Sequence, residues 1–180
     1  MSLIQKLAPD FQATAVYPDG EARPLRLSDY RGKRNVVLIF YPFDFTFLCP
    51  TEILAFSKHI AEFERRNVQL IGCSIDSHHV HRAWRNTPPE QGGIGAIEYP
   101  LIADVDRLVA RDFGVLLEGG MAARGTFLID RKGVVRHELV NDLPLGRSVE
   151  ETLRIVDALQ YTEEHGEACP DEWTKGKPPM

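Results

Sequence analysis

Residues 35–41 read NVVLIFY, a short apolar run rich in β-branched residues that follows the turn-like sequence Arg31-Gly32-Lys33. A run of this length and β-branched content predicts a strand that is buried on both faces of a sheet. Further on, four apolar side chains recur at the spacing of one helix face: Ile53, Phe56, Ile60 and Phe63. We therefore expect a strand followed by an amphipathic helix that ends near Asn67.

The same alternation repeats downstream. Residues 68–75 (VQLIGCSI) form a second apolar run, and Ser77 is a residue type that caps helices. That helix would pass through Trp84 and stop at Pro88-Pro89, because proline interrupts a helix interior. Two strand–helix units in succession predict parallel strands joined by helical crossovers.

The second half of the chain has two short apolar runs with a turn between them. Residues 126–130 (TFLID) and 134–139 flank Arg131-Lys132-Gly133, which predicts an antiparallel hairpin. Ser148-Val149-Glu150-Glu151 then has the form of a capping box. It begins a last amphipathic helix with four apolar residues on one face: Val149, Leu153, Val156 and Leu159. The pattern ends after Tyr161.

Together these patterns predict an α/β protein with a thioredoxin-like fold, in which helices cover both faces of a central mixed β-sheet. No repeat or linker divides the chain, so residues 1–162 are expected to form one domain. Residues 163–180 are rich in glycine, proline and charge. We expect them to be a mobile C-terminal tail that carries Cys169.

Composition excludes several classes of function. The 180 residues carry a formal net charge of −5 with both signs interspersed, so we expect no nucleic-acid partner. Residues 1–11 contain no apolar run long enough for a signal peptide or a membrane span, which favours a cytoplasmic protein with no membrane partner. Three cysteines, none in a C-x-x-C pair, predict a transient rather than a structural disulfide.

Cys49 lies where the first predicted strand passes into the first predicted helix. The connecting residues 41–52 (YPFDFTFLCPTE) place it at or in the first helical turn. Backbone amides and the helix dipole stabilise an anion there, and a thiolate is such an anion. Pro50 suits a first turn, since its missing N–H would have no partner inside the helix. For an isolated cysteine, a buried structural role would be the alternative.

The residues around Cys49 match a family signature. Pro42, Thr46 and Cys49 form P-x-x-x-T-x-x-C, which with Pro50-Thr51-Glu52 resembles the peroxiredoxins of the typical two-cysteine subfamily. That subfamily includes bacterial alkyl hydroperoxide reductase C subunits and thioredoxin peroxidases. Further matches extend along nearly the whole chain: Ala8-Pro9-Asp10-Phe11, Ser74-Ile75-Asp76-Ser77, Gly92-Gly93-Ile94-Gly95, Arg124-Gly125, and Cys169-Pro170 with Trp173.

The resemblance implies a peroxidase that reduces hydrogen peroxide and small organic hydroperoxides. Cys49 would be the peroxidatic cysteine, and Pro42 would shield its thiolate. Thr46 and Arg124 would bind and polarise the peroxide. Glu52, which alone would be an exposed helix residue, would join a hydrogen-bond network with the arginine.

The resemblance also implies how the oxidised enzyme is reset. Cys49 would become a sulfenic acid, which Cys169 of the partner subunit converts to a Cys49–Cys169 disulfide. The unit would be a homodimer, often assembled into a decamer. Thioredoxin or a dedicated disulfide reductase would return the electrons, and no metal, haem or flavin cofactor is required. Judged from the residues alone, a bond within one chain is equally open.

Cleavage of a peroxide by a thiolate requires the same residue types. When a thiolate cleaves an O–O bond, negative charge appears on the departing oxygen. A more acidic thiol is also a weaker nucleophile, so donors aimed at the transition state are needed. The Thr46 hydroxyl, the backbone near Cys49 and the Arg124 guanidinium suit that role, although Arg124 alone would fit a surface salt bridge. A second thiol must then capture the sulfenic acid before it oxidises irreversibly, and a stray surface cysteine is the alternative for Cys169.

Other conspicuous residues are given structural interpretations. Cys73 lies inside an apolar run and is expected to be a core residue. Gly92-Gly93-Ile94-Gly95 is not expected to bind a dinucleotide, because Glu98 takes the last glycine position of that motif. Three histidines are expected at a solvated helix start rather than in a metal site, since no cysteine or carboxylate cluster accompanies them: His78, His79 and His81.

Two other functions compete with the peroxidase. An oligomeric holdase chaperone or a redox relay is disfavoured by the intact set of Thr46, Cys49 and Arg124, and a thiol–disulfide oxidoreductase by the missing C-x-x-C pair. Peroxiredoxins that over-oxidise readily carry a Gly-Gly-Leu-Gly-like loop and a C-terminal helix with a Tyr-Phe pair. This chain has the loop but not the pair. We therefore expect a tail that moves easily and a Cys49 that resists inactivation.

Overall fold

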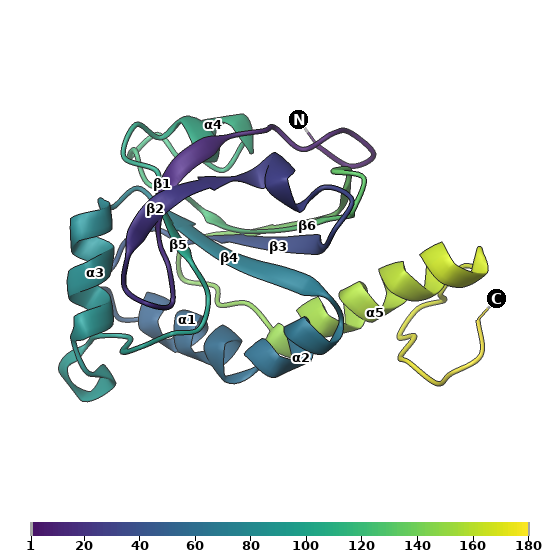
Figure 1. The fold of residues 1–180 in the computed structure, drawn as a ribbon. Helices are drawn as coiled ribbons and strands as arrows, with labels where there is room; N and C mark the ends of the chain where they lie inside the picture. Colours follow the sequence, from purple (N-terminus) through teal and green to yellow (C-terminus); the bar gives the residue numbers. More distant parts are fainter. Residues whose placement is uncertain (1, 180) are drawn as a thin grey trace.

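The computed structural model describes residues 2–179, and its seven strands form one sheet in the order β2-β1-β5-β4-β3-β6-β7 (Figure 1). The strands are β1 (Gln12–Val16), β2 (Ala22–Arg26), β3 (Asn35–Phe40), β4 (Val68–Ser74), β5 (Leu101–Ala103), β6 (Arg124–Ile129) and β7 (Val135–Asn141). The helices are α1 (Cys49–Lys58), α2 (Ile60–Arg65), α3 (His78–Asn86), α4 (Leu108–Asp112) and α5 (Val149–His165), with short 3-10 turns η1 (Leu27–Tyr30) and η2 (Pro89–Gln91).

Strand β3 lies near the middle of the sheet, and all six of its residues are buried. It pairs in parallel with β4, where Leu38 faces Ile71, and antiparallel with β6, where Leu38 faces Phe127. The sheet is therefore mixed, which confirms the prediction. Because β3 and β6 are antiparallel neighbours, the end of β3 and the start of β6 meet at one edge of the sheet.

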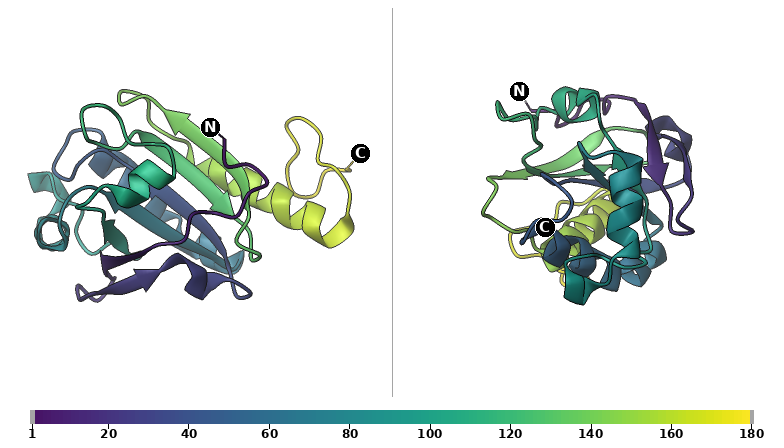
Figure 2. Two further views of the ribbon diagram at one scale, coloured as in Figure 1. Left: turned by 90° about the horizontal axis from the view of Figure 1, so that it is seen from above. Right: turned by 90° about the vertical axis from the view of Figure 1, so that its left-hand side faces the viewer.

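Helices cover both faces of the sheet, as the sequence predicts. Helices α1, α2 and α5 lie on one face and α4 on the other (Figures 1 and 2). The core on the first face includes Ile53, Phe56 and Phe63, three residues of the predicted apolar stripe. The core on the second face includes Val109 and Phe113.

The first predicted helix is split into α1 and α2. The backbone of His59 leaves the helical region, with φ −104° and ψ 13°. Its ring nitrogen Nδ1 lies 2.8 Å from the carbonyl oxygen of Ala55. Both short helices keep their apolar side chains on the sheet, so the interruption leaves the predicted stripe intact.

The structure contradicts the expectation that the α3 histidines are all solvated. Ser77 does cap α3, since its hydroxyl accepts a hydrogen bond from the Val80 N–H at 3.3 Å. One turn further on, however, His81 is fully buried. Its ring nitrogens lie 2.7 Å from Asp44 Oδ2 and 2.9 Å from the Ile102 carbonyl oxygen. These partners come from distant segments, so local sequence gave no sign of them.

The predicted hairpin and last helix are confirmed, but the helix is longer than expected. Thr126 faces Leu139 across β6 and β7, and the Ser148 hydroxyl accepts from the Glu151 N–H at 3.1 Å. Helix α5 continues past Tyr161, so the expected end there is wrong. Its exposed polar last turn closes at Gly166, which adopts the left-handed conformation (φ 71°) that glycine favours. The division between residues 162 and 163 thus falls inside a helix.

The segment after α5 folds back on that helix (Figure 2). Trp173 is 1% exposed, and its ring centroid lies 5.0 Å from that of Tyr161. The Arg154 guanidinium donates to the Trp173 carbonyl oxygen at 3.2 Å. A buried tryptophan therefore anchors the tail. The mobility of residues 163–180 stays a prediction.

The sequence did not predict the strands at the other end of the sheet or α4. Ahead of β1, the N-terminal segment pairs with the start of β7. The Gln5 N–H donates to the Val135 carbonyl oxygen, and the Val135 N–H donates to the Lys6 carbonyl oxygen, both at 2.9 Å. In the part of the chain from residue 2 to 179, no helix has the length and apolar character that crossing a membrane requires.

Candidate active site

Cys49 is the first residue of α1, where the sequence predicts it. The loop that leaves β3 delivers it there, and Leu48 is the N-cap, which makes no side-chain capping hydrogen bond. Pro50 follows in the first turn, and the Cys49 side chain is fully buried. The sulfur therefore sits at an uncapped helix N-terminus, where the helix dipole favours a negative charge.

Arg124 approaches the sulfur from β6. Its Nη1 lies 3.4 Å from Cys49 Sγ and 2.6 Å from Glu52 Oε2, while its Nε donates to the Leu143 carbonyl oxygen at 2.6 Å. The residue is 4% exposed. The antiparallel pairing of β3 with β6 explains the meeting of residues so far apart in sequence, because Arg124 begins the strand beside the end of β3.

Glu52 holds this arginine together with a second one, Arg147. Arg147 donates to Glu52 Oε1 from its backbone N–H and from Nε, both at 2.9 Å, and to Oε2 from Nη2 at 3.1 Å. Burial favours the neutral acid, but the hydrogen bonds and charge of Arg147 and the charge of Arg124 outweigh it. They hold the pKa of the Glu52 carboxyl below its ordinary value.

Arg147 is the functional residue that sequence reasoning missed. Its side chain is fully buried, and its Nη1 also donates to the carbonyl oxygens of Phe40 and Gly125, each at 2.8 Å. It thus ties together the ends of β3, β6 and α1. The one local signal is its position just before the Ser148 cap, which places it at the start of a predicted helix without indicating any partner.

The loop before Cys49 carries the other two expected residues. Pro42 is buried, and Thr46 is half-buried. The Thr46 hydroxyl donates to the Phe43 carbonyl oxygen at 3.3 Å. Rotation about a single side-chain bond redirects a threonine hydroxyl, so the group can serve a ligand without a change in the backbone.

A buried network anchors this loop to the sheet. The Tyr41 hydroxyl donates to Asp44 Oδ1 at 2.9 Å, and His81 Nδ1 lies 2.7 Å from the other Asp44 oxygen. Both His81 ring nitrogens face acceptors, an arrangement that suits the protonated ring. Burial favours the neutral ring, but the hydrogen bond and charge of Asp44 outweigh it and raise the pKa of His81.

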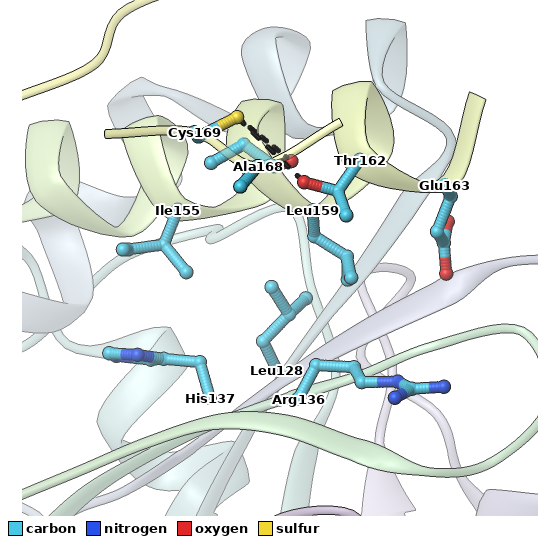
Figure 3. Close-up of a pocket in the computed structure, with 10 residues that line it drawn as sticks. Leu128, Arg136, His137, Ile155, Leu159, Thr162, Glu163, Ala168 and Cys169 are labelled. Atoms are coloured by element: carbon cyan, nitrogen blue, oxygen red, sulfur yellow. Dashed lines mark hydrogen bonds between the residues drawn. The ribbon is translucent and has the colours of Figure 1, made fainter. Parts of the chain in front are cut away.

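Cys169 lies far from this cluster within the same chain. It is half-buried beside the middle of α5, with its sulfur 3.7 Å from the Ala158 carbonyl oxygen and 3.8 Å from Thr162 Oγ1 (Figure 3). Arg147, which contacts Glu52, lies just before α5. From Val149 to Ala158 the helix rises by nine residue steps, roughly 14 Å. A disulfide requires sulfurs about 2 Å apart. The structure therefore does not bring Cys49 and Cys169 together.

Cys73 is a core residue, as expected. It is fully buried in β4, and burial raises its thiol pKa well above the ordinary value. A neutral, inaccessible thiol is a poor nucleophile. Among residues 2–179, no group of three or more His, Cys, Asp or Glu side chains comes together as metal ligands would.

Comparison with known proteins extends these observations. The family model described as AhpC/TSA matches residues 4–138, and that described as the C-terminal domain of 1-Cys peroxiredoxin matches residues 158–180. Peroxiredoxin-1 of Gallus gallus is 56% identical over 97% of this chain and 88% of its own length. Alkyl hydroperoxide reductase C of Helicobacter pylori strain J99 is 53% identical over the same shares.

A solved structure covers the whole chain. The reduced 2-Cys peroxiredoxin of Plasmodium vivax superposes with a TM-score of 0.99 at 46% identity, over 100% of this chain and 93% of that one. The agreement confirms the thioredoxin-like fold predicted from the sequence. It includes the C-terminal segment that carries Cys169.

Proposed function

Since this chain belongs to the AhpC/TSA family of peroxiredoxins and is a thiol-dependent peroxidase, we propose that Cys49 is the sulfur that attacks the peroxide. The observation that carries this proposal is the 3.4 Å separation of Arg124 Nη1 and Cys49 Sγ. A guanidinium so close stabilises a thiolate before the reaction and the departing oxygen during it.

In the first step the Cys49 thiolate attacks one oxygen of the hydroperoxide. An S–O bond forms as the O–O bond breaks, the sulfur is oxidised by two electrons, and the departing oxygen takes a proton to leave as water or an alcohol. Arg124 and the Thr46 hydroxyl donate to the peroxide oxygens, while Pro42 shields the sulfur from water. Glu52 and Arg147 act through Arg124 as positioning residues.

In the second step a thiolate at Cys169 attacks the sulfur of the Cys49 sulfenic acid. An S–S bond forms as the S–O bond of the sulfenic acid breaks, and the departing hydroxide takes a proton from the solvent to leave as water. The separation of the two sulfurs within one chain supports a partner subunit as the source of Cys169. The N-terminal segment pairs with the start of β7, but beyond Val135 the described part of the chain places no strand along its outer edge. This open stretch supports a homodimer, since an open edge pairs readily with a second copy.

The remaining parts of the proposal rest on the family. Five such dimers would form a decamer. Thioredoxin or a dedicated disulfide reductase would reduce the disulfide in the cytoplasm, and this scheme requires no metal, haem or flavin. The substrates would be hydrogen peroxide and small organic hydroperoxides.

Peroxide consumption with a dithiol donor tests the proposal. Cys49→Ser should abolish turnover, and Cys169→Ser should consume a single equivalent of peroxide. On a non-reducing gel, one equivalent should double the mass of the wild-type chain but not that of Cys169→Ser. Turnover by Cys49→Ser would overturn the assignment.

A further inference from the structure

The loop that leads to Cys49 contains a strained residue to which the mechanism above gives no role. Phe45, four residues before Cys49, has a φ of 55°, in the left-handed region that glycine adopts freely. Five of the described non-glycine residues have a positive φ, and Phe45 is the one aromatic residue among them. A bulky side chain in this region is an outlier, and such outliers cluster at active sites and switch regions.

The left-handed conformation lies where the loop turns towards the reactive sulfur. Asp44 and Phe45 form a turn, and a positive φ at its second residue is a geometry that favours glycine or asparagine. Asp44 is fixed on one side of the bend, because its N–H donates to Asp76 Oδ2 at 2.9 Å and its carboxylate belongs to the buried network described above. On the other side, only residues 46–48 separate the bend from Cys49. The backbone of Phe45 therefore sets the path by which the chain reaches the sulfur.

Few contacts hold this bend closed. In the described part of the chain, no backbone–backbone hydrogen bond of ordinary geometry involves residues 42–47. The Phe45 ring packs instead against Trp84 of α3, with ring centroids 6.1 Å apart. Trp84 is fully buried, whereas Phe45 is 49% exposed. A ring contact of this kind and a strained backbone residue have free energies of similar size and opposite sign, so neither outweighs the other by much.

The second step of the reaction requires the segment around Cys49 to open. The Cys49 side chain is fully buried, and a disulfide requires a second sulfur about 2 Å away. A cysteine side chain of another segment, which is larger than a peroxide, cannot approach a buried sulfur while the loop stays closed. Once the loop opens, Phe45 is free to leave the left-handed region and its strain is released.

We propose that Phe45 is a positioning residue of the peroxidase, whose left-handed backbone sets Cys49 for attack and whose strain helps the loop to open afterwards. This proposal rests on the proposed function, since opening is needed only if Cys49 has to meet Cys169. The phenylalanine side chain acts in both directions. Its ring holds the bend closed through Trp84, while its Cβ atom destabilises the same bend.

Paired substitutions separate the strain from the loss of the ring. Phe45→Ala and Phe45→Gly both remove the contact with Trp84, but only alanine keeps the strain. The reduced loop should therefore open about five-fold less often in Phe45→Gly than in Phe45→Ala. The rate at which a polymer-linked maleimide labels Cys49 measures this opening, because the sulfur is buried while the loop is closed. Cys169→Ser in every chain removes the competing thiol, and peptide mass spectrometry locates the label.

Phe47 offers a matched control in the same loop. It is fully exposed, and its φ is negative. Glycine at this position adds only flexibility, so Phe47→Gly should be labelled at least as fast as Phe47→Ala. Phe45→Asn is a second test variant, because asparagine tolerates the left-handed region while keeping a Cβ atom. It should be labelled more slowly than Phe45→Ala.

Chains that keep Cys169 test the effect on the reaction. After one equivalent of peroxide, Phe45→Gly should form the disulfide about five-fold more slowly than Phe45→Ala. In excess peroxide, Phe45→Gly should also accumulate more Cys49 sulfinic acid, because the sulfenic acid waits longer for the second thiol.

Equal labelling of Phe45→Ala and Phe45→Gly, or faster labelling of Phe45→Gly, would overturn the proposed strain. Slower labelling without slower disulfide formation would overturn its role in the second step. Failure of the proposed function looks different: neither sulfenic acid nor disulfide would form at Cys49 in the wild type, whereas the order of labelling would be unchanged.

Discussion

Replacement of Glu52 by glutamine should destabilise the fold and slow the enzyme together. The carboxylate accepts four hydrogen bonds of 2.6–3.1 Å from Arg124 and Arg147, and its side chain is 4% exposed. In glutamine an NH₂ group replaces one carboxylate oxygen, so it faces the N–H groups that donate to that oxygen in the wild type. The guanidinium charges of Arg124 and Arg147 also lose their counter-ion. Breaking a buried ion pair by removing one partner costs about 3–5 kcal/mol, and we expect about 3 kcal/mol here.

The pH dependence of this loss has a defined sign. The pKa of the Glu52 carboxyl is lowered on folding, so its contribution to the free energy of unfolding is present above the ordinary value of 4.5. It disappears as the pH falls through the pKa of the folded protein. The difference in stability between wild type and Glu52→Gln should therefore shrink as the pH is lowered below about 4.5.

Urea unfolding followed by circular dichroism, from neutral to acidic pH, measures this difference. Stopped-flow oxidation of Cys49 measures the accompanying loss of Arg124 positioning. Glu150→Gln is the matched control, since Glu150 is exposed in the first turn of α5. A Glu52→Gln protein within about 1 kcal/mol of wild type at neutral pH would refute the reasoning, because an average point mutation costs that much without breaking a buried ion pair.

Three further outcomes are expected. Arg124→Met should lower the second-order rate constant for Cys49 oxidation about a hundred-fold, the usual effect of one lost transition-state donor, as stopped-flow mixing with peroxide can show. The raised pKa of His81 means that its contribution to stability is present below the ordinary value of 6.5 and fades at higher pH. Wild type should therefore lose more unfolding free energy than His81→Asn between about pH 6 and about pH 9, and parallel losses would contradict this. Repeated turnover at low-micromolar peroxide should leave most activity intact, and early loss with a Cys49 sulfinic acid detected by mass spectrometry would show that resolution is slow.

The parts of the fold that sequence predicts are those with a strong local pattern. Two segments have a local pattern that predicts burial: the run at residues 35–41 and the helical stripe that includes Ile53 and Phe56. The structure confirms that both are buried. The second strand, β2, has a single buried residue, Leu25, so it lacks such a pattern. Helix α4 spans five residues and depends on Asp104, whose carboxylate accepts from the Val109 and Ala110 N–H groups.

The candidate site divides in the same way. The position of Cys49 follows from the adjacent strand and helix, which are local, and Arg124 from the family resemblance. Arg147 and His81 acquire their roles from partners 95 and 37 residues away. An arginine before a helix cap and a histidine at a helix start carry no sign of such partners, because both are common on exposed surfaces.

The two strands that pair with β3 are synthesised at different times, and this determines when the nascent chain can complete its core. Its parallel partner β4 is soon available, but β6 leaves the ribosome only after roughly 80 more residues, which takes about 4–16 s at 5–20 residues per second. For those seconds a strand with five consecutive apolar residues lacks hydrogen bonds along one side. Newly made chains should therefore be most vulnerable to association just before β6 emerges.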